Sequence, residues 1–498
     1  MQGYECGDKL IHYLSAVECV KYVANDRDND QSDYYTSDEF LAVFDRIWRE
    51  LGKMDKRLFP DFGTIKDSAI FKSSPFHKLY PDQLEAKANI EMIIKNALED
   101  TTAPRGQLIF IEGASGTGKT VLNSTLFYDL CMETKEDSNR KRWNCHLVVN
   151  HDEQLKVYED IRNKLMISSI DDDFVSKSSH FIMKYYRKDK ETGKIPDVDV
   201  VFVDEAHLLL SQKNQAYTNS FDQIEAMRKI ARVVVIMFDQ RQVMHIQDYW
   251  DPVYVDALRQ EAKNQAARTG ISYYYKLTEQ LRISGSEDTV NWITDFTDKH
   301  IIGKIPDDPD YEIKIFDSPF DMEKELKKKA QSEEHKLSRI ISTFDWPYSS
   351  VSSPTKGKPY WMVSIDTKTG LWEKPWNREL TRYIKKRRRK DKRSWAEQPQ
   401  TIDEVGSTFT IQGADLSVAA VILGPSVDFK NGMIYFDKSK HEDRKAKNKR
   451  TMPNGSKESF AEMFIDNEVN VLMKRGVHAL YIYAVDDDLR EALLEAAE

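Results

Sequence analysis

The sequence has little cysteine and no long apolar run, which argues against disulfide-rich, zinc-binding and membrane-spanning proteins. Its four cysteines are scattered without a close pair or a neighbouring cluster of metal ligands: Cys6, Cys19, Cys131 and Cys145. This argues against a disulfide framework or a zinc site and is compatible with a reducing cytosol, so we expect a cytoplasmic protein. No apolar run approaches the ~18 residues that a membrane span needs. The first residues, MQGYECGDKL, lack the apolar core of a signal peptide.

An excess of positive charge is also missing. Lysine and arginine number 73 against 82 aspartates and glutamates, which gives a formal net charge of -9. The chain is therefore not one that coats polyanions over its whole surface, although a local basic groove would still bind nucleic acid. Its length of 498 residues, with 31% charged and 40% hydrophobic residues, indicates a soluble globular protein of two or three domains.

Residues 1–75 have a helical pattern. Thr36 and Glu39 have the spacing of a capping box. Six apolar residues then recur at helical spacing: Phe40, Leu41, Phe44, Ile47, Trp48 and Leu51. We expect a small helical region that buries one face against the next domain, which is the usual meaning of such a stripe.

Residues 76–270 alternate short apolar runs with helical stretches such as 83–98 and 221–230. Four runs have the length and composition of strands: Leu108–Ile111, His146–Val149, Val200–Val203 and Val233–Met237. Continuous apolar runs suit strands that are buried on both faces of a parallel sheet. The alternation predicts a doubly wound α/β lobe.

Residues 271–498 are interpreted as a second α/β lobe. Its strand candidates are Ser272–Leu277, Val418–Leu423 and Ala479–Ala484. Between the first two lies a polar stretch, about 320–405, that is rich in Trp, Lys and Arg, and we interpret it as an insertion. The two lobes would be a duplication of fold, because no short internal repeat is visible in the sequence.

A glycine-rich segment after the first strand matches the full pattern G-x4-G-K-[ST]. Its residues are Gly113, Ala114, Ser115, Gly116, Thr117, Gly118, Lys119 and Thr120, and a helix-forming run follows. Glycines let backbone N–H groups turn inward around phosphate oxygens, and the helix N-terminus adds positive partial charge. We expect Lys119 to reach the β- and γ-phosphates of ATP and the Thr120 hydroxyl to hold Mg²⁺.

Two carboxylates follow the strand Val200–Val203, at the edge where α/β sheets place their ligands. We expect Asp204 to hold Mg²⁺ and Glu205 to accept a proton from the attacking water. His207 has two interpretations of equal weight: it senses the nucleotide state, or it packs at the start of a helix.

Polar residues also follow the strand Val233–Met237. Asp239 is assigned to the nucleotide site, and Gln242 is expected to bond the γ-phosphate or the lytic water. Upstream, the amide of Gln83 offers a donor and an acceptor to an adenine edge. In isolation, however, a glutamine at a helix N-terminus is more often merely exposed.

Two arginines are candidates for catalysis from the second lobe. Arg282 follows the first strand candidate of that lobe, and Arg475 precedes the last one. A guanidinium brought to the γ-phosphate neutralises charge in the transition state, and such groups are worth about 10³–10⁵ in rate. Lone arginines are surface charges by default, but their order after the other motifs favours a catalytic role.

The order of these elements resembles the motif series of superfamily 1 helicases. Motifs I to III correspond to Gly113–Thr120, Asp204–His207 and Asp239–Gln242, and the Q-motif to Gln83. Motifs IV to VI correspond to Gln280–Arg282, Thr410–Asp415 and Lys474–Gly476. The closer resemblance is to the Schlafen group 3-like DNA/RNA helicase domain family. It rests on the C-terminal phrases Phe409–Asp415, Val421–Pro425, Val471–Gly476 and Leu480–Tyr483, and it covers about residues 76–498.

The resemblance implies two RecA-like P-loop lobes, with ATP between them and single-stranded DNA or RNA across their top. It places Gln412 and Gly413 at the nucleotide and implies that Gln412 and Asp415 couple nucleotide to nucleic acid. The chain departs from the family pattern at two positions: Lys474 stands where threonine is usual, and Asp415 where glutamate is usual.

A basic run, Lys385–Lys390 with Lys392 and Arg393, stands out in this acidic chain, and four tryptophans surround it: Trp361, Trp372, Trp376 and Trp395. Phosphates attract such charge, and aromatic faces stack on unpaired bases. The alternative is a solvated insertion whose tryptophans pack on the second lobe. We favour packing for the tryptophans and weigh the two interpretations of the basic run equally.

Two functions from different classes fit these observations. The first is an ATP-hydrolysing helicase or translocase acting on single-stranded or partly duplex nucleic acid. The second is a nucleotide-dependent switch or assembly ATPase, such as one in phage defence, that unwinds nothing. The motif V and VI equivalents favour the first function, while the acidic net charge and Lys474 leave room for the second. A small-molecule kinase would not need Arg282 and Arg475 from a second lobe.

Overall fold

The computed structural model describes residues 40–54, 73–100, 102–136, 143–167, 169–170, 172–192, 198–211, 222–332, 335–349, 352, 354, 357–380, 393–411, 413–452 and 455–498. The chain divides into two compact units, residues 1–68 and 69–498. The described part of the first unit is helix α3 (Phe40–Met54), and it confirms the helix predicted from the apolar stripe. Thr36 and Glu39 lie outside the described residues.

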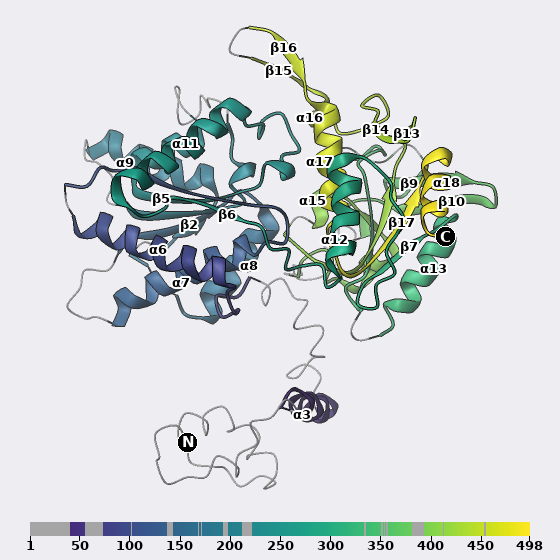
Figure 1. The fold of residues 1–498 in the computed structure, drawn as a ribbon, viewed down its shortest axis with the longest axis horizontal. Coiled ribbons are helices and arrows are strands. Elements are labelled where there is room, and N and C mark those ends of the chain that lie inside the picture. The colour runs from purple at the N-terminus through teal and green to yellow at the C-terminus, as the bar shows by residue number, and fades with distance from the viewer. Residues whose placement is uncertain are drawn as a thin grey trace. The chain divides into compact units, whose positions relative to one another are not determined.

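The second unit contains two α/β lobes, each built on a parallel sheet (Figure 1). The sheet of the first lobe has six strands in the order β3-β2-β4-β5-β1-β6. The strands are β1 (Gln107–Gly113), β2 (Cys145–Val149), β3 (Val175–Ser176), β4 (Val198–Asp204), β5 (Ala231–Phe238) and β6 (Tyr274–Leu277). All four strands predicted for this lobe are confirmed, and their residues are buried on both faces, as continuous apolar runs require.

Helices cover both faces of the first sheet. One face carries α6 (Pro81–Glu99), α7 (Lys119–Glu136) and α8 (Asp152–Lys164), and the other carries α9 (Ser178–Thr192), α10 (Gln223–Ile230) and α11 (Pro252–Thr269) (Figure 1). Helices α7 to α11 connect parallel strands in the manner of a doubly wound sheet, and α6 precedes β1. The carboxyl ends of the strands therefore meet along one edge, where Gly113, Asp204 and Phe238 end β1, β4 and β5.

The sheet of the second lobe has five parallel strands in the order β11-β8-β12-β17-β7. They are β7 (Glu312–Ile315), β8 (Arg339–Ser342), β11 (Val405–Gly406), β12 (Leu416–Leu423) and β17 (Gly476–Ala484). The flanking helices are α12 (Glu287–Thr294), α13 (Pro319–Lys329), α15 (Thr408–Ile411), α17 (Ala461–Met473) and α18 (Asp487–Ala496), and the short helix α16 (Arg444–Lys447) contacts α17. The chain thus has the predicted α/β fold of two RecA-like lobes.

Alternate residues of the central strands of this sheet pack into separate cores on its two faces. Along β12, one core takes Ala419, Val421 and Leu423, and the other takes Val418, Ala420 and Ile422. This is the two-residue period of a strand that is covered on both sides. The second of these cores also contains Trp372 and Trp376, and Trp361 packs against it. Trp395 is buried in the first, so the predicted packing of the tryptophans is confirmed.

Two details of the second lobe were predicted wrongly. The strand that ends at Leu277 was assigned to this lobe, but it forms β6 and pairs with β1 in the first sheet. The stretch 320–405 was interpreted as an insertion, yet it contains β8, which lies between β11 and β12 in the second sheet. The hairpin of β9 (Met362–Thr367) and β10 (Gly370–Pro375) also lies in this stretch. Most of the basic run, 385–390 and Lys392, lies outside the described residues.

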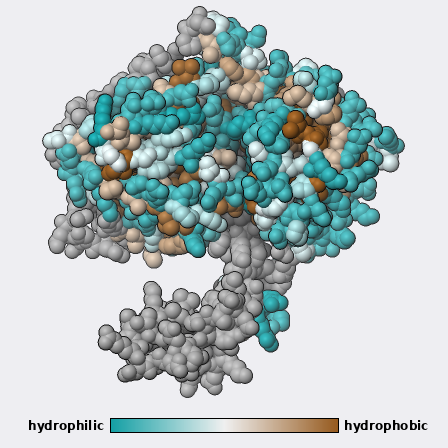
Figure 2. All heavy atoms as spheres, in the orientation of Figure 1, coloured by the Kyte–Doolittle hydropathy of each residue, from teal (hydrophilic) through white to brown (hydrophobic). Residues whose placement is uncertain are grey.

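Two further hairpins lie between β12 and α17. The first joins β13 (Val427–Lys430) to β14 (Met433–Phe436), and the second joins β15 (Lys449–Thr451) to β16 (Lys457–Ser459). The second hairpin projects from the body of the lobe (Figure 1). The face in Figure 2 is mostly hydrophilic with small, separate hydrophobic patches. Among the helices that the structure describes, none is long and apolar enough to cross a membrane.

Candidate active site

A cavity of about 650 Å³ lies between the carboxyl edge of the first sheet and the second lobe. Lys119, Glu205 and Gln242 line it from the first lobe, and Asp415 and Arg475 line it from the second. Its position is the one at which open α/β sheets bind ligands. Its size lies within the usual range for small-molecule sites, about 300–1,000 Å³. The residues predicted from separate parts of the sequence therefore converge on one space.

The loop Gly113–Thr120 has the predicted strand–loop–helix context, because β1 ends at Gly113 and α7 begins at Lys119. Gly116 and Gly118 have φ angles of +88° and +76°, a region that side-chain-bearing residues rarely adopt. A Cβ on Gly118 would lie only 2.3 Å from Nε2 of Gln83. Glycine is therefore needed there both for the turn and for the close packing of α6 on the loop.

The ammonium group of Lys119 is held inside the loop. Its Nζ donates to the carbonyl oxygens of Gly113, at 2.7 Å, and of Ala114, at 2.8 Å. Asp239 Oδ2 lies 3.6 Å from the same nitrogen. An ammonium bonded only to carbonyls and one carboxylate can exchange these partners for phosphate oxygens, so the geometry fits the predicted role.

Gln83 lies at the cavity, but both ends of its amide are already bonded within the protein. Nε2 donates to the Thr117 carbonyl at 3.0 Å, and Oε1 accepts from the Tyr80 backbone N–H at 3.0 Å. The side chain thus links the start of α6 to the phosphate loop. Adenine recognition by Gln83 stays a prediction, and it would require the amide to release these two bonds.

Asp204 ends β4, directly before the cavity-lining Glu205, and is almost fully buried. Its Oδ2 accepts from Tyr158 Oη at 2.6 Å and from Gln154 Nε2 at 2.7 Å. Burial, and then the charge of Glu205, raise the pKa of Asp204 to about 6, against hydrogen bonds from Tyr158 and Thr120 that lower it. The carboxylate form therefore predominates at neutral pH.

Thr120 and Asp204 fit a magnesium site of the kind that is completed by a substrate. Mg²⁺ is usually bound by one or two protein groups together with phosphate oxygens and water. Across the part of the chain that the structure describes, no group of three or more His, Cys, Asp or Glu could hold a metal ion. A magnesium ion at this hydroxyl and carboxylate would therefore depend on a bound nucleotide for its remaining ligands.

Glu205 has a strained backbone and a carboxylate oxygen free to accept a proton. Its φ and ψ are 49° and 47°, in the left-handed region, which costs a non-glycine residue of order 1–3 kcal/mol. Among the described residues, Oε2 of Glu205 has no hydrogen-bond partner although it is buried. Burial raises the pKa of Glu205, and the charges of Lys119 and Arg475 partly oppose the rise. Strain and an unpaired buried acceptor together are typical of a functional group rather than a structural one.

His207 lies in the short helix η2 (Ala206–Leu208) and is fully buried. Its ring meets Phe238 edge-on at 6.5 Å, and Nε2 lies 3.4 Å from Glu205 Oε2. Burial lowers the pKa of His207 to about 4, so the ring is neutral at pH 7. It packs in the core beside Glu205, and a sensing role stays a prediction.

The residues after β5 form the short helix η3 (Gln240–Gln242), which is capped by Asp239. Gln242 Nε2 donates to Asp239 Oδ2 at 2.7 Å, while its buried Oε1 has no partner in the described structure. Burial alone would raise the pKa of Asp239, but the charge of Lys119 holds it below the usual value. Gln242 thus offers a free acceptor at the cavity, as its predicted contact with a water or phosphate group requires.

Arg282 reaches the phosphate loop from the segment that follows β6. Its Nη1 donates to Ser115 Oγ at 2.5 Å, and Nε pairs with Asp415 Oδ1 at 2.6 Å. The adjacent Leu281 N–H donates to the Gly116 carbonyl at 2.9 Å. Because β6 belongs to the first sheet, the prediction that Arg282 comes from the second lobe is wrong. It lies on the connection between the lobes.

Arg475 does come from the second lobe, immediately before β17. It is almost fully buried, lines the cavity, and donates from Nη1 to the Ala414 carbonyl at 3.2 Å. Burial, and then the nearby charge of Arg282, lower the pKa of Arg475 to about 10, so it remains charged at neutral pH. Its Nε has no hydrogen-bond partner among the described residues. An unpaired buried guanidinium beside Glu205 suits an anionic ligand in the cavity.

The segment before β12 completes the second-lobe side of the cavity. A Cβ on Gly413 would lie 2.8 Å from Gln154 Oε1, so this segment touches the residue that bonds Asp204. Gln412 lies outside the described residues, and its coupling role stays a prediction. Sequence reasoning missed Gln154 and Tyr158. Their helical i,i+4 spacing after β2 was the available signal, but only the neighbouring positions of β2 and β4 bring them to Asp204.

The chain is similar to several known proteins. Two of the solved structures it matches are the Pif1 helicase from Candida albicans (15% identity, 51% of this chain, TM-score 0.23) and an arterivirus nonstructural protein 10 helicase in complex with DNA (12%, 81%, 0.29). This chain spans 55% and 64% of those two chains.

A protein of Saccharomyces cerevisiae described as uncharacterized is 30% identical over 425 residues, which cover 78% of this chain and 84% of that protein. The family model described as Schlafen group 3, DNA/RNA helicase domain, matches residues 106–486, which span both sheets and the cavity between them. The chain therefore belongs to the Schlafen group 3 DNA/RNA helicase domain family.

Proposed function

We propose that this chain is an ATP-hydrolysing motor, a superfamily 1-type helicase or translocase that acts on single-stranded or partly duplex DNA or RNA. The observation that carries the proposal is the cavity itself, where Arg475 of the second lobe faces Lys119 and Glu205 of the first. A nucleotide bound by both lobes makes their relative position depend on whether the γ-phosphate is present. Hydrolysis can then change the arrangement of the lobes and move a bound strand.

The proposed chemistry begins with binding by the phosphate loop. Backbone N–H groups of Gly113–Thr120 cradle the phosphates, and Lys119 exchanges the Ala114 carbonyl for phosphate oxygens. When bound, magnesium would neutralise charge on the β- and γ-phosphates, with Thr120 and Asp204 as its protein ligands. Asp239 stays beside Lys119, with 3.6 Å between its Oδ2 and the lysine Nζ.

The proposed hydrolysis step uses groups that the protein leaves unbonded. Glu205 Oε2 accepts the proton of the attacking water, and Gln242 Oε1 helps to orient that water. Arg475 stabilises the charge that develops on the transferred phosphoryl group. Arg282 bonds Ser115 of the loop and Asp415 of the second lobe. It therefore links the movement of the second lobe to the phosphate loop, and it also brings positive charge to that loop.

The proposed nucleic-acid contact includes a basic arm, residues 438–459, which contains α16 and the β15–β16 hairpin. Its sequence has eight Lys or Arg residues against three Asp or Glu, in a chain whose net charge is -9. Four of its basic residues are exposed and form no ion pair within the described structure: Arg444, Lys445, Lys449 and Lys457. Unpaired exposed charge on a projecting element suits the phosphate backbone of a polynucleotide.

A titration of ATPase rate against single-stranded DNA and RNA tests the proposal. We expect the rate to rise with added strand and the affinity for the strand to fall steeply with salt. A chain that binds ATP but is indifferent to every strand would instead act as a nucleotide-dependent switch or assembly ATPase, and the motor proposal would be wrong.

The basic arm is tested by replacing its four unpaired residues with alanine. We expect the salt slope of single-strand binding to fall by ~0.7 for each phosphate that the arm no longer neutralises. The matched control replaces Lys229, Lys299, Lys327 and Lys358, which are ion-paired elsewhere on the protein. If the salt slope of single-strand binding were equal in both variants, the arm would not belong to the proposed interface.

A further inference from the structure

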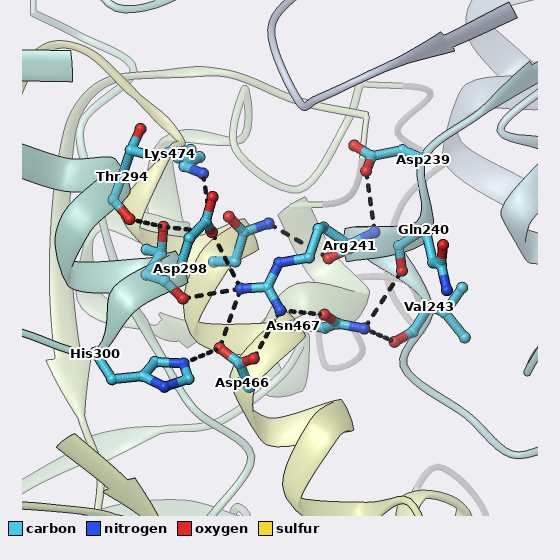
Figure 3. Close-up of polar contacts among 12 residues, drawn as sticks. Asp239, Gln240, Arg241, Val243, Thr294, Asp298, His300, Asp466, Asn467 and Lys474 are labelled. Atoms are coloured by element: carbon cyan, nitrogen blue, oxygen red, sulfur yellow. Dashed lines mark hydrogen bonds and ion pairs between the residues drawn. The ribbon is translucent and has the colours of Figure 1, made fainter. Parts of the chain in front are cut away.

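The tip of β5 is fixed to the second lobe through Arg241, a residue with no role in the chemistry described above. Figure 3 shows its guanidinium between Asp466 of α17 and Asp298 of the short π-helix η4 (Asp295–Lys299). Nη1 donates to Asp466 Oδ2 at 2.6 Å, and Nη2 donates to Asp466 Oδ1 at 3.1 Å and to Asp298 Oδ1 at 3.2 Å. A paired fork of this kind specifies direction as well as distance.

Further contacts fix the same helix to the same loop. Asn467 Oδ1 accepts from Arg241 Nη1 at 2.9 Å, and its Nδ2 donates to the Val243 carbonyl at 2.7 Å (Figure 3). About one turn later, Asn470 Nδ2 donates to the Arg241 carbonyl at 3.3 Å. One face of α17 is therefore bonded to residues 241–243, the loop that places Gln242 in the cavity.

Helix α17 in turn determines where Arg475 lies. It ends at Met473, two residues before Arg475, and the Arg475 N–H bonds back to the Leu472 carbonyl at 3.3 Å. Within the described structure, the guanidinium of Arg475 donates one hydrogen bond, to the Ala414 carbonyl. Its position consequently depends on the helix that leads into it more than on its own side-chain contacts.

Lys474 adds a contact to this set. Its Nζ lies 3.7 Å from Asp298 Oδ1, the oxygen that also accepts from Arg241 (Figure 3). Its carbonyl accepts from Arg282 Nη1 at 3.2 Å. Lys474 thus joins the Arg241 contacts to the arginines at the cavity.

From these contacts we infer that Arg241 is a positioning residue. It fixes the position of α17, and through α17 that of Arg475, relative to Gln242 across the nucleotide cavity. The inference rests on the proposed ATPase activity. Arg241 itself touches no substrate, since its guanidinium is occupied by the second lobe. Its removal should misplace Arg475 while leaving the phosphate loop intact, and small misplacements of a catalytic group cost of order 10²-fold in rate.

The test combines Arg241→Ala with Arg475→Ala in the full chain. We expect Arg241→Ala to lower kcat by roughly 10- to 100-fold with little change in affinity for a non-hydrolysable ATP analogue. If Arg241 acts through Arg475, adding Arg241→Ala to the Arg475→Ala variant should produce almost no further fall in single-turnover rate. Arg241→Lys, which keeps the charge but not the fork, should fall between the wild type and Arg241→Ala.

Arg228→Ala is the matched control, because Arg228 forms an equally close pair with Glu261 inside the first lobe. The inference would be overturned if Arg241→Ala turned over ATP as fast as this control. It would also be overturned if Arg241→Ala lowered the rate equally with and without Arg475, or if it changed only the affinity for nucleotide.

Amide hydrogen exchange separates this inference from the proposed function, because it needs no turnover. Exchange in α17 should rise in Arg241→Ala but not in Arg228→Ala. A wild-type chain without ATPase activity would contradict the proposed function alone, whereas unchanged exchange in α17 would contradict the inference whatever the activity.

Discussion

The two lobes have the same architecture but present opposite edges of their sheets to the cavity. In the first lobe the site residues follow the strands, as Asp239 follows β5 and the phosphate loop follows β1. In the second lobe they precede them, since Asp415 lies just before β12 and Arg475 just before β17. A carboxyl edge thus faces an amino edge: the first lobe brings Glu205 and the phosphate loop to the cavity, and the second brings the buried guanidinium of Arg475.

Removing Lys119 should have the largest effect and test the first-lobe side alone. We expect Lys119→Ala to abolish nucleotide binding or turnover, because its ammonium is held inside the phosphate loop by the Gly113 and Ala114 carbonyls. Binding of a fluorescent ATP analogue and steady-state ATPase measure the two effects. Lys87→Ala, which removes an ion-paired lysine on α6, is the control. Wild-type turnover in Lys119→Ala would show that the loop Gly113–Thr120 does not bind the phosphates as proposed.

Removing Arg475 tests the second-lobe side. We expect Arg475→Ala to lower kcat by about 10³–10⁵ while the ATP analogue still binds, because the guanidinium acts on charge that develops in the transition state. Single-turnover hydrolysis measures the effect. If kcat were unchanged, the second lobe would not take part in hydrolysis and the comparison between the two edges would fail.

Glu205→Gln should have a smaller effect on rate and a distinct signature. The amide keeps the shape of the side chain but cannot accept the proton of the attacking water, so we expect kcat to fall by about 10²–10⁴. Bound ATP should be retained unhydrolysed, which filter binding with labelled ATP detects. Normal hydrolysis by this variant would reject the general-base role.

The mildest test is pH, because it titrates the buried neighbours Asp204 and Glu205 without a substitution. The pKa of Asp204 is raised to about 6 by burial, so below that pH the group is protonated and a poor magnesium ligand. We expect kcat/KM for ATP to fall as pH drops through about 6. The same group affects stability, because a raised pKa means that the folded chain binds the proton more tightly than the unfolded chain. The resulting contribution to the free energy of unfolding is complete below the pKa of the unfolded chain and should decline as pH rises toward 6.

Tyr158→Phe sharpens this prediction. It removes a hydrogen bond that lowers the pKa of Asp204, so the midpoint of the pH profile should move upward. A profile that is flat to pH 5 in both proteins would show that Asp204 does not control activity.

Local pattern predicted the first lobe better than the second. The phosphate loop and strands β1, β2, β4 and β5 could be identified directly, because glycine geometry and apolar runs are local properties. β6 was assigned to the wrong sheet because its partner β1 lies about 160 residues earlier, and no local pattern encodes that pairing. Gln154 and Tyr158 were missed for the same reason, because their contact with Asp204 depends on the order of strands in the sheet.

The contacts of Arg241 show the same limit. Its position in motif III was visible in the sequence, but its partners Asp466 and Asp298 come from α17 and η4, far along the chain. The sequence marked it as a polar residue at a strand end, and only the packing of the two lobes reveals what it binds.

The basic arm has a mechanical consequence, because it also clasps the first lobe. Arg450 of the arm donates to the Tyr249 carbonyl at 2.5 Å, and the ring of Phe460, directly after the arm, stacks on Tyr249 at 4.0 Å. The second lobe is therefore held here in addition to the covalent connection through Leu281 and the ion pairs of Arg241. Because a lobe held at Tyr249 can turn about that contact more easily than it can move away, we expect a swivel rather than a separation during turnover. A cross-link that locks position 249 to position 460 should be tolerated, and inactivation of the ATPase on cross-linking would contradict this pivot.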